Sequence, residues 1–191
     1  MSLLTFYSKS LTTGMLFSLF LFAGFNSFAQ KKQDLSKIEG DLDKMGLEFY
    51  MPVENTFKFK KLRLSEFYSY DSRIRAKSGE MEILIALHPD EGDALTSLYP
   101  HIEFNRLLGN LTPNDDDQNV MVIGWRKQKL ADRNADWGAE AYFRPRKAIT
   151  SFPNAKLVAF FKEGSGMVIM LYCFDKPESV PKLFSFKDVL N

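Results

Sequence analysis

The sequence has few of the residues with which most catalytic and metal sites are built. Its 191 residues include one cysteine, Cys173, and two histidines, His88 and His101. A single thiol cannot form a disulfide within the chain, and two histidines in different segments form no pair that would hold one metal ion. There is also no phosphate-binding glycine loop and no nucleophile beside a base. We therefore predict no catalytic residues, no metal and no cofactor.

The chain also lacks an excess of one charge. It has 25 Lys and Arg against 24 Asp and Glu, and Lys9 is the only charged residue among the first 29. Without those 29 residues the two signs balance. Nucleic acids and anionic membranes select proteins with a basic footprint, so an even balance gives no general reason to expect either as a partner. We expect no nucleic-acid partner.

The first 29 residues, which are nearly free of charge, are predicted to be an export signal. Met15 to Phe25 form a continuous apolar core, and Ser27 and Ala29 are small residues at the positions that a signal peptidase requires. A membrane-spanning helix needs ~20 apolar residues, and this run ends after roughly eleven. We expect cleavage after Ala29, a secreted or periplasmic protein, and no membrane span in the mature chain.

The residues after the signal fit one domain. Residues 30–46 are polar except for a narrow stripe of Leu35, Ile38, Leu42 and Met45, which predicts a lead-in segment or a short helix. Residues 47–191 then form a single α+β domain.

Alternation of apolar and polar residues predicts most of the strands. Met81 to His88 alternate and end at Pro89, and Trp137 to Phe143 alternate before Arg144. The segment 167–174 is apolar at every position, which is typical of a central strand, and Gly164 with Gly166 marks a hairpin loop before it. Further strands are expected at residues 47–51, within 57–70 and at 157–161.

Two other segments have a helical character. Phe104, Leu107, Leu108 and Leu111 follow a helical spacing, so a helix is expected from Pro100 to near residue 110. A final helix is expected over residues 179–190, whereas residues 120–125 form a short apolar run and residues 126–135 are charged and irregular. Hairpins with two or three helices set apart in sequence predict an antiparallel sheet with its helices packed on one face.

The most distinctive segment is Asn134 to Glu140, because a strand entered through Asp136, Trp137 and Gly138 is not explained by packing alone. Trp137 is expected in the core, and Gly138 allows another group to approach closely. Asp136, Glu140, Tyr142 and Arg144 would then project together from the polar face. With Trp137 they form the candidate binding residues.

Three weaker candidates have simpler explanations. Asp115, Asp117 and Asn119 match the first ligands of a calcium loop, but Val120 and Arg126 stand where its glycine and glutamate belong, which favours a solvated acidic turn. Cys173 lies among apolar residues and is expected to be buried. An ordinary charged surface is favoured over a continuous basic strip for Arg126, Lys127, Lys129, Arg133, Arg144, Arg146 and Lys147.

Several segments resemble a group of short exported proteins of unknown function from Bacteroidota. The resemblance is carried by Leu47 to Pro52, by the Glu82 to Pro89 strand, by Asn134 to Ala139 and by the Phe160 to Asp175 hairpin. The order of elements is similar to the PsbP-type α+β sandwich, whose members are mostly accessory factors of larger assemblies. The resemblance implies a binding or assembly role and carries no catalytic residues to this chain.

Together these observations favour an exported, non-enzymatic module that binds a protein partner or an envelope component through the open face of its sheet. Two alternatives stay open. The aromatic residues, among them Tyr68, Tyr70 and Trp137, suggest a carrier of a small apolar ligand. The second alternative is an enzyme whose carboxylates, such as Asp136 and Glu140, come together only in the folded structure.

Overall fold

The computed structural model describes residues 38–50, 56–63, 65–92, 99–114, 119–176 and 180–188. The chain divides into residues Met1–Lys37 and a compact unit, Ile38–Asn191, and only the second contains described residues. The predicted export signal lies outside them. In the part of the chain that is described, no helix has the length and apolar character needed to cross a membrane.

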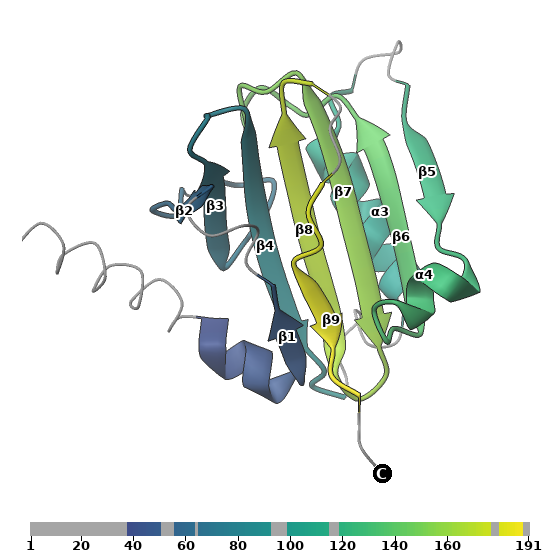
Figure 1. Ribbon diagram of the computed structural model, residues 1–191. Coiled ribbons are helices and arrows are strands. Elements are labelled where there is room, and N and C mark those ends of the chain that lie inside the picture. Colours follow the sequence, from purple (N-terminus) through teal and green to yellow (C-terminus); the bar gives the residue numbers. More distant parts are fainter. Residues whose placement is uncertain are drawn as a thin grey trace, which may run out of the picture. The chain divides into compact units, whose positions relative to one another are not determined.

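An antiparallel sheet of seven strands forms the body of this unit (Figure 1). The strands in their order across the sheet are β2 (Phe57–Phe59), β3 (Ser72–Ala76), β4 (Met81–Pro89), β8 (Gly166–Phe174), β7 (Asn154–Lys162), β6 (Trp137–Phe143) and β5 (Met121–Gly124). Two further strands, β1 (Leu47–Phe49) and β9 (Phe184–Phe186), pair antiparallel in a small second sheet. The α+β class predicted from the sequence is confirmed.

The central strand is β8, as its unbroken apolar sequence predicts. All nine of its residues are buried, and it pairs along its whole length with β4 on one side and β7 on the other. Its odd-numbered side chains enter one core and its even-numbered side chains enter a second core on the opposite face. A strand with both faces covered has no room for polar side chains, which explains the sequence.

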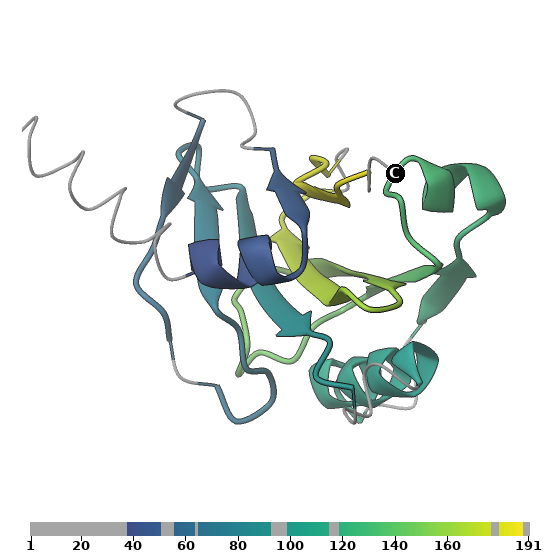
Figure 2. The ribbon, with the colours of Figure 1, turned by 90° about the horizontal axis from the view of Figure 1, so that it is seen from below.

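Each face of the sheet is covered by different elements (Figure 2). On one, the α3 face, helix α3 (Pro100–Leu111) packs against β6 and β7 and buries Phe104, Leu107 and Leu111. On the other, the β1/β9 face, the two-stranded sheet and a short helix over residues 38–44 cover β4 and β8. The prediction that all helices lie on one face is therefore wrong, because the buried Ile38 places the short helix opposite α3.

The C-terminal helix predicted over residues 179–190 is also wrong in the described residues 180–188. Leu183, Phe184 and Phe186 are buried, and residues 184–186 form β9 instead. Pairing with β1 satisfies the backbone of this segment, and the aromatic side chains complete the β1/β9 core. Conversely, a short helix, α4 (Lys127–Ala131), lies within the stretch expected to be irregular.

Candidate functional site

Strand β6 positions the residues that the sequence singled out. Its register with β7 sends Trp137, Ala139, Ala141 and Phe143 into the α3 face, where Trp137 packs edge-on against Phe104 with ring centroids 5.9 Å apart. Trp137 is partly buried and packs against this core, so its predicted core position is met only in part. Glu140 lies between Ala139 and Ala141 on β6, so its side chain belongs to the opposite face of the sheet.

Glu140 is the centre of a small ionic cluster on the β1/β9 face. One carboxylate oxygen, Oε2, accepts from Lys129 Nζ at 2.5 Å and lies 3.0 Å from Lys156 Nζ. The Lys156 ammonium also sits 4.8 Å from the centroid of the Tyr142 ring. We name Lys129, Glu140, Tyr142 and Lys156 the Glu140 cluster.

The two lysines set the charge of Glu140. Burial raises the pKa of this carboxyl, but the hydrogen bonds and charges of Lys129 and Lys156 outweigh burial, so the pKa is lowered overall. Glu140 is therefore ionised at neutral pH and occupied by partners from its own chain. A carboxylate in that state does not act as a general acid, and its negative charge is neutralised before any ligand arrives.

Trp125 packs beside the Glu140 cluster and is the reason that residue 138 is a glycine. The indole stacks on Phe160 with ring centroids 5.6 Å apart, and Lys129 lies 4.7 Å above the ring. A Cβ added to Gly138 would lie 2.6 Å from Trp125 Cδ2, closer than real carbon atoms approach. The close approach predicted for Gly138 is thus confirmed, and the group that approaches is Trp125. The indole Nε1 is buried without a hydrogen-bond acceptor in the described residues.

Asp136 and Arg144 lie at opposite ends of β6. Asp136 Oδ2 accepts from the backbone N–H of Glu163 at 2.8 Å and so fixes the β7–β8 hairpin. Arg144 is exposed just beyond the other end of β6. The five predicted residues are therefore spread along both faces and both ends of one strand, and Asp136 and Glu140 have separate partners.

The basic residues are similarly divided. Arg126, Lys127 and Lys129 lie around α4, beside the start of β6, whereas Arg144 follows its end. Arg146 Nε donates to Asn110 O at 2.8 Å, next to α3. The two basic segments thus lie a strand length apart, and the ordinary charged surface favoured by the sequence is what the structure contains.

The sequence candidates that remain are the thiol of Cys173 and the possible metal ligands. Cys173 is buried, as predicted, and burial raises the pKa of its thiol to about 12. Among the described residues, no group of three or more His, Cys, Asp or Glu side chains is placed to hold a metal ion. Asp115 and Asp117, two of the calcium-loop candidates, lie outside the described residues.

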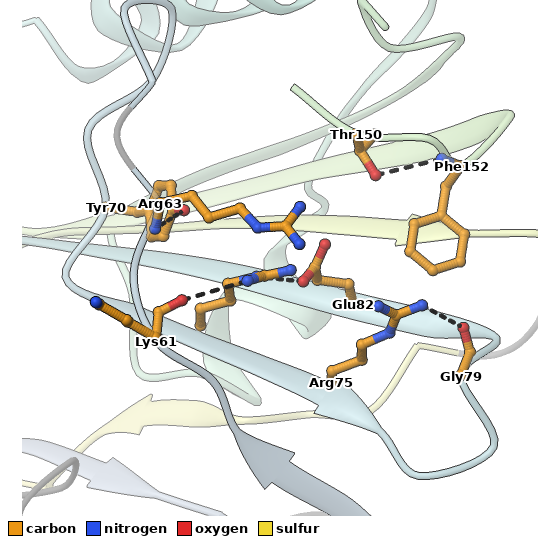
Figure 3. A network of polar contacts seen from close by, with 9 residues as sticks. Lys61, Arg63, Tyr70, Arg75, Gly79, Glu82, Thr150 and Phe152 are labelled. Carbon is orange, nitrogen blue, oxygen red and sulfur yellow. Dashed lines mark hydrogen bonds and ion pairs between the residues drawn. The ribbon is translucent and has the colours of Figure 1, made fainter. Parts of the chain in front are cut away.

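Sequence analysis missed a polar network beneath the β2 end of the sheet (Figure 3). Arg73 and Glu82 form a buried ion pair between β3 and β4, and Arg73 Nη1 donates to Lys61 O at 3.2 Å. Neighbouring Arg75 lies 5.7 Å from the centroid of the Phe152 ring. Buried charges that satisfy one another in this way hold strands in register, so we assign the network a structural role.

The exposed surface of greatest interest is β5, which the sequence shows only as a short apolar run. Val120, Met121, Val122 and Ile123 expose 38%, 54%, 52% and 40% of their surfaces. β5 is the last strand of the sheet, and no described residue pairs with its outer side (Figure 1). Monomeric proteins rarely leave a run of large apolar side chains on a free sheet edge.

The backbone of β5 also offers free hydrogen-bonding groups. Trp125 N donates to Gly138 O, and the register pairs Ile123 with Glu140, so the odd-numbered residues bond to β6. The N–H and C=O groups of Val122 and Gly124 consequently point away from the sheet. A Cβ placed on Gly124 would meet nothing within 4 Å, so the face of β5 is uncovered at this residue.

No protein-family model, no curated protein and no solved structure matches the chain.

Proposed function

We propose that this protein is an exported, non-enzymatic binding or accessory module, and that it engages a protein partner through the free edge of β5. Export rests on the leader sequence. The partner surface rests on one observation, the run of exposed apolar residues formed by Val120 and the first three residues of β5, a strand with unpaired backbone groups. A partner that adds a strand to such an edge gains main-chain hydrogen bonds for affinity and side-chain contacts on both faces for specificity.

The proposed surface is the edge of the sheet, whereas the sequence suggested its open face. Both faces over β4 and β8 are covered by the protein's own elements. Glu140 and Lys156 are buried in their mutual contact. On β6, Tyr142 lies directly opposite Met121 of β5, so the exposed part of the predicted site borders the edge strand.

Basic residues frame this edge. Arg126 and Lys127 follow β5 and are exposed, and Lys129 is partly exposed above Trp125. Charges at the rim of an interface steer association and select partners more than they add affinity. Antiparallel sheet with helices packed on it also supports the likeness in layout to the PsbP-type fold, which we retain as part of the proposal.

Co-purification from the native host tests this function. The full chain and its Val122→Lys variant, which places a charge on the outer edge, are used to capture partners from an envelope extract. Ile102→Lys is the matched control, because Ile102 is similarly exposed but lies on α3. We expect a stoichiometric partner with the wild type and with Ile102→Lys, and its loss with Val122→Lys. Equal capture by all three proteins would refute the β5 surface.

A further inference from the structure

Basic side chains gather on the α3 face at the β2 end of the sheet. The register places Lys58 of β2 beside Arg75 of β3, and Arg75 beside Glu82 of β4. Glu82 in turn pairs with Cys173, which belongs to the core of the α3 face, so this row of side chains lies on that face. Helix α3 packs on β6 and β7, so the row is not under that helix.

A second row lies beside the first. Lys60 N donates to Arg73 O at 2.8 Å, which extends the pairing of β2 with β3 and puts Lys60 next to Arg73 on the same face. Arg63 comes from the segment after β2, and Figure 3 shows its guanidinium directed toward the Glu82 carboxylate. We name these five cations the basic patch: Lys58, Lys60, Arg63, Arg73 and Arg75.

The basic patch has more positive charge than its surroundings neutralise. Arg73 is 6% exposed and is paired with Glu82. Within the described part of the chain, no carboxylate lies at ion-pairing distance from the other four cations. Asp71, which precedes β3, accepts from the backbone N–H of Leu87 at 2.8 Å instead. Four positive charges therefore lie together without a counter-charge from these residues.

The cations are close enough to repel one another. Arg75 and Arg73 lower the pKa of Lys60, after the larger effect of Lys58, as neighbouring positive charges do. Lys58 and Arg63 are exposed, and Arg75 is partly exposed, so a solute can reach them. A negative ligand would relieve this repulsion.

The basic patch also has hydrogen-bond donors to spare. Each guanidinium carries five N–H groups in a planar fork that fits the oxygens of a carboxylate or a phosphate. Arg75 Nη2 donates to Gly79 O at 3.4 Å, whereas the Arg63 guanidinium has no acceptor among the described residues. Tyr70 Oη accepts from Arg63 N at 2.9 Å, which leaves the Tyr70 O–H hydrogen for another acceptor.

The extent of the basic patch favours a compact anion. Neighbouring strands lie about 4.8 Å apart, so the patch is about 10 Å wide from β2 to β4. Beyond β4 the same face continues into β8, which is buried and apolar, so the patch does not extend along the sheet as a polymer would require. A phosphate monoester brings about two negative charges to one group, whereas a carboxylate brings one. Four unpaired cations match the phosphate better.

We infer that the basic patch binds a phosphate group, either inorganic phosphate or a phosphate monoester. Arg63 and Arg75 are its principal contacts, Lys58 and Lys60 add charge, and the buried Arg73–Glu82 pair supports them from below. The ligand lies on the face of the strands and leaves the edge of β2 unpaired. This site is separate from β5 and goes beyond the proposed function.

Calorimetric titration with inorganic phosphate, at constant ionic strength in chloride, tests the site. The wild type should bind phosphate. Arg63→Gln and Arg75→Gln each remove one fork and should weaken binding at least about tenfold. The matched control is Arg126→Gln, an exposed arginine beyond β5, which should bind like the wild type. A wild type that does not bind phosphate, or an equal loss with Arg126→Gln, would overturn the inference.

Two further arms distinguish the source of the phosphate. Glycerol phosphate is a soluble monoester, and vesicles of phosphatidylcholine with phosphatidic acid present a monoester on a lipid. Binding of glycerol phosphate that Arg63→Gln weakens supports a soluble ligand. Co-sedimentation with the vesicles that Arg63→Gln abolishes supports a lipid headgroup at the same site.

The basic patch and the β5 edge can fail separately. Val122→Lys should bind phosphate like the wild type, and Arg63→Gln should still capture the protein partner. Loss of phosphate binding in Val122→Lys would contradict a separate site. Loss of the partner in Val122→Lys alone bears on the proposed function and leaves the phosphate site standing.

Discussion

The two edges of the seven-stranded sheet are built in opposite ways. At one edge, β2 is three residues long, contains Lys58 and is followed by Lys60 and Lys61. The charge of Lys58 lowers the pKa of Lys60, which shows how closely these cations are gathered. At the other edge, β5 has no charged residue and exposes three consecutive apolar side chains, preceded by the exposed Val120.

The difference indicates which edge is kept free of partners. Lysines on a short edge strand prevent a second sheet from docking, and β2 has that protection. β5 has neither charge nor cover, although such an edge carries a risk of aggregation. Protection of one edge alone fits a sheet that uses the other edge for binding.

The largest expected effect concerns the β2 side, where the Arg73–Glu82 ion pair lies under the protected edge. Glu82→Gln leaves the buried Arg73 without its counter-charge and should cost about 3 kcal/mol of unfolding free energy or more. Urea denaturation measures the loss. Glu80→Gln, at an exposed site two residues earlier, is the control and should change stability by less than about 0.5 kcal/mol. Equal stability of the two variants would contradict a structural role for the pair.

On the β5 side, Gly138 sets the next largest effect. Gly138→Ala forces the added Cβ into the Trp125 ring, which Phe160 holds from behind, and should cost about 2 kcal/mol. Gly124→Ala introduces the same methyl group on β5 in open space and should be nearly neutral. Denaturation followed by tryptophan fluorescence compares them, and similar midpoints for the two variants would show that Trp125 is free to move.

Proline substitutions in β5 test the direction of its hydrogen bonds. Ile123→Pro removes an N–H that bonds to β6, whereas Val122→Pro removes one that points outward. The first should be less stable than the second by about 1 kcal/mol, the net contribution of one hydrogen bond. Val122→Pro should nonetheless abolish capture of the partner. If Val122→Pro were the less stable variant, the even-numbered residues of β5, not the odd-numbered ones, would bond to β6.

The smallest effect is the pH dependence of the Glu140 cluster beside β5. Because the pKa of Glu140 is lowered in the folded protein, its contribution is present above the ordinary carboxyl pKa of about 4.3 and is lost as pH falls through the folded value. Exposure of Lys129 keeps this contribution below about 1 kcal/mol. Glu140→Gln should flatten the acid limb of the stability curve, and Glu66→Gln, at an exposed site, should not. An identical acid limb for wild type and Glu140→Gln would refute the pairing.

Residue patterns predicted the centre of the fold better than its margins. The alternation in β4 and β6 and the apolar run of β8 reflect local burial, and these strands lie where they were expected. The C-terminal helix was wrong because β9 is stabilised by β1, about 140 residues away in the sequence and invisible to any local pattern. Helices on both faces were missed for the same reason.

For the candidate site, the sequence predicted the surroundings of single residues but not the contacts between residues from different elements. The close approach at Gly138 followed from its neighbours in the chain and is confirmed, and Trp137, expected in the core, packs partly buried against it. That Glu140 meets Lys129 and Lys156 depends on three separate elements, which no spacing along the chain reveals. The apolar residues of β5 were visible, but only its place at the end of the sheet makes them exposed.

Hydrogen exchange at the two edges tests the central claim most directly. The amides of Val122 and Gly124 on β5, and those of Phe57 and Phe59 on β2, all point outward by the register of their strands. We predict that the β5 amides exchange rapidly in the protein alone and become protected when the captured partner is added, while the β2 amides stay unchanged. Exchange at Val122 and Gly124 that is independent of added partner would contradict the role assigned to this edge.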